Sequence, residues 1–200
     1  MVTSTPNSTI VRALDRVQSA TVDFPVVRLR PLDRQEAGHV VDAVFAQLSP
    51  QSRFLRFHSP VPRLPGPVRA GLVDLDGRSR AAIVAEVLGP DGPAPVGIAR
   101  LACTGDGTAD VAVAVVDAWQ RLGVGSRLVA ALAALAAQLG YTKLSGAVLP
   151  ENVAMLGMVR SVFPAVLSHY DGDVVQVAVR TGAAAWTVTE EDVMADLLRR

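Results

Sequence analysis

The chain has 200 residues, half of them hydrophobic, and its 19 basic and 19 acidic side chains cancel to zero formal net charge. This length suits one domain whose core is large enough to fold without disulfides or a structural metal. The charge balance argues against a nucleic-acid-binding domain, for which a basic face is expected. A single cysteine, Cys103, excludes an intrachain disulfide and is interpreted as a small buried apolar residue.

No segment reads as a targeting signal or a membrane span. Residues Met1 to Ser8 are rich in Ser, Thr and Pro and lack the apolar stretch of a signal peptide. The longest apolar stretch, Leu128 to Leu139, is far shorter than the roughly 20 residues needed to cross a bilayer. We therefore expect a soluble, cytoplasmic protein with no membrane partner. Lysine occurs once, at Lys143, so the other eighteen of the 19 basic residues are arginines.

The first third of the chain predicts a tail, a strand and two helices. Residues 1–23 read as a flexible tail with a short amphipathic pattern, and one domain is expected over 24–200. Val26 to Arg30 predicts the first strand. The run Asp33-Arg34-Gln35-Glu36 resembles a capping box, and apolar residues follow it at helical spacing as far as Leu48.

A second short helix is expected over Gln51 to His58, capped by Ser49-Pro50. The proline-rich run Val61 to Pro67 predicts irregular structure. Short glycine-bearing connections then predict two antiparallel hairpins. The three strands concerned are Ala81–Leu88, Val96–Thr104 and Thr108–Val116. Glu86 interrupts the first of them, and we expect it to face solvent or an edge, with a buried second base as the alternative.

A glycine turn, Gln120-Arg121-Leu122-Gly123-Val124-Gly125, separates the last of these strands from a long apolar helix, Ser126 to Leu139. The first N–H groups of a helix lack intrahelical partners and carry partial positive charge, so this arrangement is typical of a phosphate cradle. Gly123 and Gly125 allow close backbone approach or a positive φ. An ordinary strand-to-helix turn is the alternative. The run matches neither the P-loop nor the dinucleotide-binding fingerprint.

The remaining elements complete a mixed α/β pattern. Thr142 to Leu149 predicts a strand, and a parallel pair with a right-handed crossover is expected across the long helix. A helix follows Asn152, and Asp171-Gly172 predicts a hairpin between Ala165–Tyr170 and Asp173–Arg180. A last helix is expected over Glu190 to Leu198. The fold class is therefore α/β, with a largely antiparallel central sheet and flanking helices.

The glycine turn resembles the Gln/Arg-x-x-Gly-x-Gly/Ala signature of the GNAT acetyltransferase superfamily. The stretch Glu151-Asn152-Val153-Ala154-Met155-Leu156 is also similar to that family, which commonly carries an Asn followed by a helix here. The resemblance is specific across Val96 to Phe163 and extends from Val26 to Arg180. It implies a GNAT acyl-CoA N-acyltransferase fold, with acetyl-CoA or another acyl-CoA as co-substrate and an amine acceptor. The scattered histidines and single cysteine give no metal-ligand pattern, so no metal is expected.

The resemblance also implies which residues hold the co-substrate. In the family the sheet splays at this strand end, and pantetheine lies there like an added strand; by position its backbone partners are Val115 and Val116. The pyrophosphate would meet the N–H groups of Arg121, Gly123, Val124, Gly125 and Ser126. The side chains of Arg121 and Arg127 could add charge, although a surface arginine is an equal interpretation of Arg127. Asn152 caps its helix, contacts pantetheine, or does both.

Asp110 is the candidate general base. It opens the strand whose alternation places Asp110, Ala112, Ala114 and Val116 on one face, and the two alanines leave room beside the carboxylate. Bacterial protein-lysine acetyltransferases of this family carry a Glu ten residues before the Gln of the motif, and Asp110 stands ten before Gln120. The shorter side chain favours proton transfer through water. An Asp at a strand entry is the alternative.

A general acid is not evident. Many family members carry a Tyr seven residues after the Asn, but here that position is Val159, and Val162-Phe163-Pro164 replaces the usual Leu-Gly-Phe. The resemblance thus implies an N-acetyltransferase acting by direct attack in a ternary complex. A non-catalytic acyl-CoA-binding or regulatory module is the alternative, and a structural subunit is a third.

The acceptor is expected to be a protein lysine or a small-molecule amine. The run Ser52-Arg53-Phe54-Leu55-Arg56-Phe57-His58 is similar to a stretch in actinobacterial-type protein-lysine acetyltransferases, in a region that helps to form the acceptor site. We expect Phe54 and Phe57 to pack in the core. By analogy with the family, a homodimer could form through Asp173–Arg180 and the terminal helix.

Overall fold

The computed structural model of the chain describes residues 26–89 and 92–182. Its strands are β1 (Val27–Pro31), β2 (Arg80–Gly89), β3 (Gly92–Gly105), β4 (Thr108–Val115), β5 (Lys143–Val148), β6 (Val166–Asp171) and β7 (Val174–Arg180). Its helices are α2 (Arg34–Ala46), α3 (Pro50–Phe57), α4 (Gly66–Val73), the short 3-10 helix η1 (Asp117–Trp119), α5 (Val124–Gln138) and α6 (Val153–Val162). One seven-stranded sheet runs in the order β1-β2-β3-β4-β5-β7-β6. Neighbouring strands are antiparallel except β4 and β5, which are parallel.

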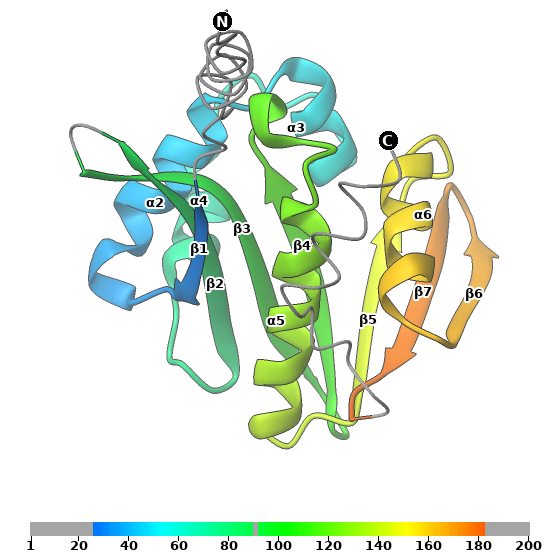
Figure 1. Ribbon diagram of the computed structural model, residues 1–200. Helices are drawn as coiled ribbons and strands as arrows, with labels where there is room; N and C mark the ends of the chain where they lie inside the picture. The colour runs from blue at the N-terminus through cyan, green and yellow to red at the C-terminus, as the bar shows by residue number, and fades with distance from the viewer. Residues whose placement is uncertain (1–25, 90–91, 183–200) are drawn as a thin grey trace, which may run out of the picture.

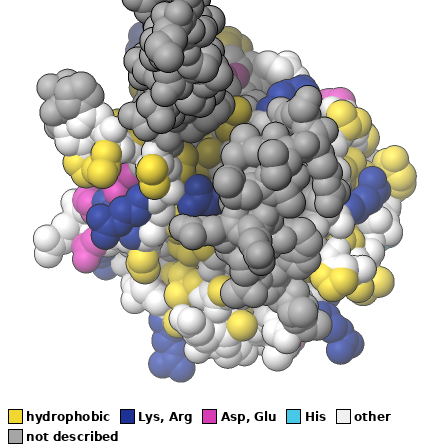
Figure 2. Space-filling view, in the orientation of Figure 1, with side chains coloured by type: hydrophobic (Ala, Val, Ile, Leu, Met, Phe, Trp, Pro, Cys, Tyr) yellow, Lys and Arg dark blue, Asp and Glu magenta, His cyan; other side chains and the backbone are white. Residues whose placement is uncertain are grey.

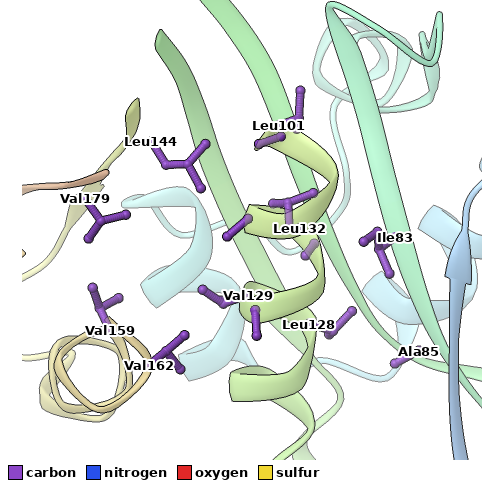
Figure 3. Packing of buried hydrophobic residues seen from close by; sticks show 14 of the residues in the cluster. Ile83, Ala85, Leu101, Leu128, Val129, Leu132, Leu144, Val159, Val162 and Val179 are labelled. Carbon is purple, nitrogen blue, oxygen red and sulfur yellow. The ribbon is translucent and has the colours of Figure 1, made fainter. Parts of the chain in front are cut away.

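Helices lie on both faces of the sheet (Figure 1), and an apolar cluster fills the space between the helices and the sheet on each face. Because side chains alternate along a strand, β2 sends Ile83 and Ala85 to the face covered by α5, and Ala82 and Val84 to the face covered by α2. Figure 3 shows the first cluster, in which Leu128 of α5 and its neighbours lie between the strands and α6. The mixed α/β fold with a largely antiparallel sheet is thereby confirmed.

Several local predictions agree with the structure. Asp33 caps α2 by accepting a hydrogen bond of 2.8 Å from the Gln35 N–H, and the reciprocal contact from Glu36 completes the capping box. Ser49 caps α3. The tail expected over 1–23 and the helix expected over 190–198 lie outside the described residues, so the extent of the domain stays a prediction.

Helix α4 corrects the expectation of irregular structure between Val61 and Pro67. It begins at Gly66, after the N-cap residue Pro65. Pro67 lies in the first turn, where its missing N–H would have had no intrahelical partner, so proline does not prevent the helix. The short helix η1, which lies between β4 and the glycine turn, was not predicted.

Glu86 and Cys103 lie in environments opposite to those expected. Glu86 is only 6% exposed, and its carboxylate packs against the side chain of Arg30 on the neighbouring strand β1. Its carboxylate accepts hydrogen bonds of 2.9 and 2.6 Å from the Nε and one terminal nitrogen of Arg30, which also binds Glu36. Cys103 is exposed, near the hairpin end of β3.

Strands β4 and β5 are paired over only three residues. The pairs are Thr108 with Lys143, Ala109 with Leu144 and Asp110 with Ser145. Beyond Asp110 both strands continue without pairing to each other, and Figure 1 shows them close at the bottom of the view and apart toward the top. The gap therefore opens toward η1 and the glycine turn, whereas the exposed Lys143 lies at its closed end.

Two further observations concern the surface. Figure 2 shows arginine and lysine side chains scattered over the visible described face, some beside acidic groups, without a single basic patch. The expected dimer strand β7 lies inside the sheet, between β5 and β6, so β6 is the edge strand. Among the described residues no helix is long and apolar enough to cross a membrane.

Candidate active site

A cavity of about 630 Å³ occupies the gap between β4 and β5. Its size is typical of a site for a small molecule or cofactor. Its walls come from α3, β4, the glycine turn, the first turn of α5, β5 and α6. The cavity brings together seven of the predicted site residues, which are Asp110, Val115, Arg121, Gly123, Gly125, Ser126 and Asn152. Val116, Val124 and Arg127 do not line it.

The main chain at the end of β4 explains why Val115 and Val116 differ. The Val116 N–H donates a hydrogen bond of 2.9 Å to the Val96 carbonyl on β3, so this amide is already engaged. Ladder groups of an antiparallel pair alternate in direction, and the main chain of Val115 therefore turns toward the gap. The side-chain amide of Gln120 donates to the Val115 carbonyl at 3.0 Å, which leaves the Val115 N–H as the donor on this side.

The glycine turn has a positive φ at Gly123, as its sequence allows, and also at Arg121, where it was not predicted. Arg121 and Gly123 both have positive φ, at 61° and 76°. Gly123 is the N-cap residue of α5 and provides no side-chain cap, so the first N–H groups of the helix are open toward the cavity. A Cβ on Gly125 would lie 3.2 Å from the Met158 sulfur, which shows how closely α6 approaches the turn. These features fit an anionic group such as a pyrophosphate.

The side chains of Arg127 and Val124 have structural roles, and the pyrophosphate contact expected of the Val124 N–H stays a prediction. The Arg127 guanidinium donates a hydrogen bond of 2.9 Å to the Val27 carbonyl, so it ties α5 to β1. This differs from both interpretations offered by the sequence, a phosphate ligand or a solvated surface arginine. The side chain of Val124 is 1% exposed and belongs to the core beneath α5.

Asp110 is the last β4 residue that pairs with β5, and its carboxylate faces the cavity. The cavity walls partly desolvate Asp110, which keeps an exposed surface, and this desolvation raises its pKa above the ordinary aspartate value. The positive charges of Arg56 and Arg100 and the Val111 N–H act in the opposite direction. The result is a carboxylate that is more basic than a solvated one, which suits proton abstraction.

Arg56 is a site residue that was not singled out from the sequence, although the resemblance placed its stretch, Ser52 to His58, in the acceptor region. It lies in the last turn of α3, is half-buried and lines the same cavity as Asp110. Burial and the nearby charge of Arg100 lower the pKa of Arg56 to about 10, while Asp110 acts to raise it. Because α3 and β4 are far apart in the chain, no local spacing could have revealed this approach.

A hydrogen-bond network attaches α3 to the turn beyond β4. The Asp117 carboxylate accepts bonds from the Ser49 hydroxyl at 2.6 Å, the Ser49 N–H at 2.9 Å and the Ser52 hydroxyl at 2.8 Å. Gln120 donates to the Ser52 hydroxyl at 3.0 Å and to the Val115 carbonyl at 3.0 Å. The Gln of the glycine motif is thus a link between the two sides of the cavity.

The remaining candidates concern a general acid, a cap and a metal. Val159 lines the cavity, and no tyrosine does so in the described parts of the chain. Asn152 caps α6, since its side-chain oxygen accepts a bond of 3.1 Å from the Met155 N–H, and it also lines the cavity. Residues 26–89 and 92–182 contain no group of three or more His, Cys, Asp or Glu side chains that could hold a metal ion.

A sheet that parts beside a glycine turn, with an uncapped helix end facing the gap, is the arrangement that the resemblance to acyl-CoA N-acyltransferases implied. Residues 53–162, more than half of the chain, match the acetyltransferase (GNAT) family, and the chain belongs to this family.

Solved structures agree with this assignment. The GNAT domain of S. lividans PAT is similar at 25% identity and a TM-score of 0.68, over 77% of this chain and 90% of that one. A cAMP-binding acyltransferase from Mycobacterium smegmatis shares the fold at 20% identity and a TM-score of 0.55, over 96% of this chain and 58% of that one. An IAA acetyltransferase from Bacillus cereus shares it at 16% identity and a TM-score of 0.51, over 78% and 99% of the two chains. No curated protein matches the sequence.

Proposed function

We propose that the protein is an N-acetyltransferase that moves the acetyl group of acetyl-CoA to a primary amine. One observation carries the proposal: a single cavity joins the open N-terminus of α5 at one side to the Asp110 carboxylate at another. The first feature suits the donor's pyrophosphate, and the second suits the acceptor's proton. The amine would attack the thioester directly, with donor and acceptor bound together.

The donor would lie along the unpaired part of β4. The Val115 N–H is available to pantetheine, and the first turn of α5 at Gly125 and Ser126 is available to the pyrophosphate. Arg121 would add positive charge, since it lines the cavity beside the turn. Asn152 caps α6 and stands close enough to the cavity to serve the donor as well.

Asp110 would act as the general base. A lysine-type amine has a pKa near 10.4, so neutralising it at pH 7 costs roughly 4–5 kcal/mol. Asp110 takes the proton, directly or through water, and the amine nitrogen then bonds to the acetyl carbon. The carbon–sulfur bond breaks, and CoA leaves as a thiolate that water can protonate, because its thiol pKa lies near 8.5. A tyrosine acid is therefore not required by this chemistry.

Calorimetric titration with acetyl-CoA and then with CoA tests the donor site. Saturable binding of both at one site is expected, and an absence of binding at millimolar concentration would contradict the donor assignment. Thiol release with amine acceptors tests turnover. Asp110→Asn should lower turnover by about 10²- to 10⁴-fold and keep CoA affinity. Wild-type rates in that variant would show that Asp110 is not the base.

A non-catalytic acyl-CoA-binding module is the second candidate. The observation in its favour is Val159, at the position where the resemblance leads one to look for a tyrosine. The two functions separate cleanly, because a module would bind CoA but release no thiol with any amine. Thiol release with an acceptor of either class named above, a protein lysine or a small amine, would support the enzyme.

A further inference from the structure

Two side chains of opposite charge face the same cavity without joining each other. Asp110 and Arg56 both line it, yet they form no ion pair in the part of the chain that the structure describes. They are close enough to act on each other's pKa. Because both residues line one cavity, a ligand bound there can contact both.

Among the described residues, Arg56 has no hydrogen-bond or ion-pair partner. Its guanidinium lies 5.0 Å from the centroid of the Phe57 ring and makes no hydrogen bond to a described residue. The neighbouring Arg100 repels it, while one terminal nitrogen of Arg100 donates to the Gly71 carbonyl at 2.6 Å. A half-buried guanidinium with five donors and no acceptor suits an anion that presents two oxygens.

The position of Arg56 assigns that anion to the acceptor and not to the donor. Asp110, Ala112 and Ala114 share one face of β4, and Arg56 packs on this face beside the two alanines. Val113 and Val115 point to the opposite face and pack with α5. The open N-terminus of α5 already offers the donor phosphates a site, so the guanidinium stands on the side of the proposed base.

We infer that the acceptor is a small zwitterionic amine, whose ammonium group meets Asp110 and whose carboxylate meets Arg56. The inference rests on the proposed function and narrows its acceptor class. A lysine side chain that enters the cavity alone carries no anion and would leave Arg56 unpaired. A free amino acid carries both charges on one small molecule, and the length between them selects which amino acid fits.

The test compares acids with their amides. Glycine, β-alanine and γ-aminobutyrate are assayed by thiol release beside glycinamide, β-alaninamide and γ-aminobutyramide, and each rate is expressed per fraction of neutral amine. We expect kcat/KM to favour at least one acid over its amide by about 10- to 100-fold, as a hydrogen-bonded charge pair would give. The best chain length reports the spacing between Asp110 and Arg56.

Variants of Arg56 provide the second half of the test. Arg56→Gln should bring the acid-to-amide ratio close to one, mainly through the acceptor KM, and Arg56→Lys should retain part of the preference. Arg63→Gln is the matched control, since Arg63 is exposed and does not line the cavity. Thermal melting and acetyl-CoA titration of each variant show whether the fold and donor site persist.

Calorimetric titration of the same acids and amides into CoA-saturated protein gives a readout that needs no turnover. Equal affinity for acids and amides, preference for amides, efficient use of lysine peptides alone, or an unchanged ratio in Arg56→Gln would each overturn the inference. These outcomes leave the proposed function intact. Failure to bind acetyl-CoA at all would instead contradict the proposed function.

Discussion

The ionised side chain of Asp110 lowers the stability of the folded protein. Its pKa is raised in the folded protein, chiefly by partial desolvation, so the ionised form is disfavoured by folding. The sign of the pH dependence follows from this: wild-type protein should gain stability as the pH falls through that raised pKa. Sites that need a basic carboxylate commonly accept this cost.

Asp110→Asn should therefore lose activity without losing stability. At pH 7 its melting temperature is expected to equal or exceed that of the wild type, and the gain at acidic pH should disappear. Melting curves between pH 4 and 8 measure both effects. Asp106→Asn, in the exposed β3–β4 turn, is the control and should follow the wild type. A fall of several degrees in Asp110→Asn would assign a structural role to the carboxylate.

Gly123 is required to be glycine by its backbone angle and not by crowding around its Cα atom. Its φ is 76°, and a Cβ there would meet nothing within 4 Å. Gly123→Ala should therefore destabilise the protein by about 1–2 kcal/mol through strain alone. Gly71→Ala is the matched comparison, since Gly71 lies within α4 with open space and no positive φ, and it should stabilise by about 0.5–1 kcal/mol. Urea unfolding measures both, and equal effects would contradict the explanation.

The roles of single residues were predictable from the sequence where a residue acts through its neighbours in the chain. Gly123, Asp33 and Asn152 were all placed by turn or cap chemistry that spans a few residues. Arg56 and Glu86 were not, because their surroundings depend on strands and helices that meet only after folding. An exposed arginine and a buried one have the same local sequence signature.

The carboxylate of Asp117 anchors the start of helix α3 to the turn beyond β4. Burial acts to raise the pKa of Asp117, but hydrogen bonds from Ser49 and Ser52 prevail and hold it below the ordinary value. Stability from this group is therefore fully present above the unfolded-state pKa and is lost as the pH falls through the lower folded value. The same attachment positions Arg56, which lies in the last turn of α3.

Asp117→Asn should weaken this attachment. Loss of charge-assisted hydrogen bonds at an exposed site predicts a cost of about 1 kcal/mol in urea unfolding at pH 7. The acceptor KM should rise more than the KM for acetyl-CoA, because α3 lines the acceptor side. Asp173→Asn, at an exposed position between β6 and β7, serves as the control. An effect confined to acetyl-CoA would contradict this role.

The ion pair between Arg30 and Glu86 ties β1 to β2 inside the sheet. Removing only the cation should leave a buried carboxylate uncompensated, so Arg30→Ala is expected to cost about 3–5 kcal/mol. The double variant Arg30→Met/Glu86→Leu should recover most of that loss, since apolar groups of similar volume can replace a buried pair. Urea unfolding of both variants checks the prediction, and equal losses would contradict it.

The elements themselves were largely predictable, since periodicity, caps and glycine turns are local signals. Helix α4 was missed because its two prolines were read as breakers, although Pro65 precedes the helix and Pro67 lies in its first turn. The order of β6 and β7 in the sheet was equally out of reach. A hairpin signal pairs the two strands but does not say which of them pairs with β5.

At the scale of the whole molecule, the sheet has two halves that are joined by a short stretch of pairing between β4 and β5, called the seam below. Strands β1 to β4 form one half and β5 to β7 the other, and three residue pairs connect them. The resemblance predicted that the sheet splays, but only the structure shows how many residue pairs join the two halves. A ligand that bridges the gap would add contacts between the halves.

Acetyl-CoA should therefore protect the second half of the sheet more than the first. In hydrogen-exchange measurements we expect β5 and β7 to exchange faster than β2 and β3 in the unliganded protein, and to slow when the donor is present. CoA is expected to raise the melting temperature for the same reason. Uniform protection of all strands, or none, would contradict the picture of a seam.

The single lysine has a practical consequence. Lys143 opens β5 at the closed end of the gap, opposite Thr108, and its side chain is exposed. Reagents and antibodies that recognise acetyl-lysine can thus mark only one side chain of this protein, at a position outside the cavity. In a reaction mixture, any further acetyl-lysine signal belongs to the acceptor, because the enzyme itself can contribute at most one acetylated lysine.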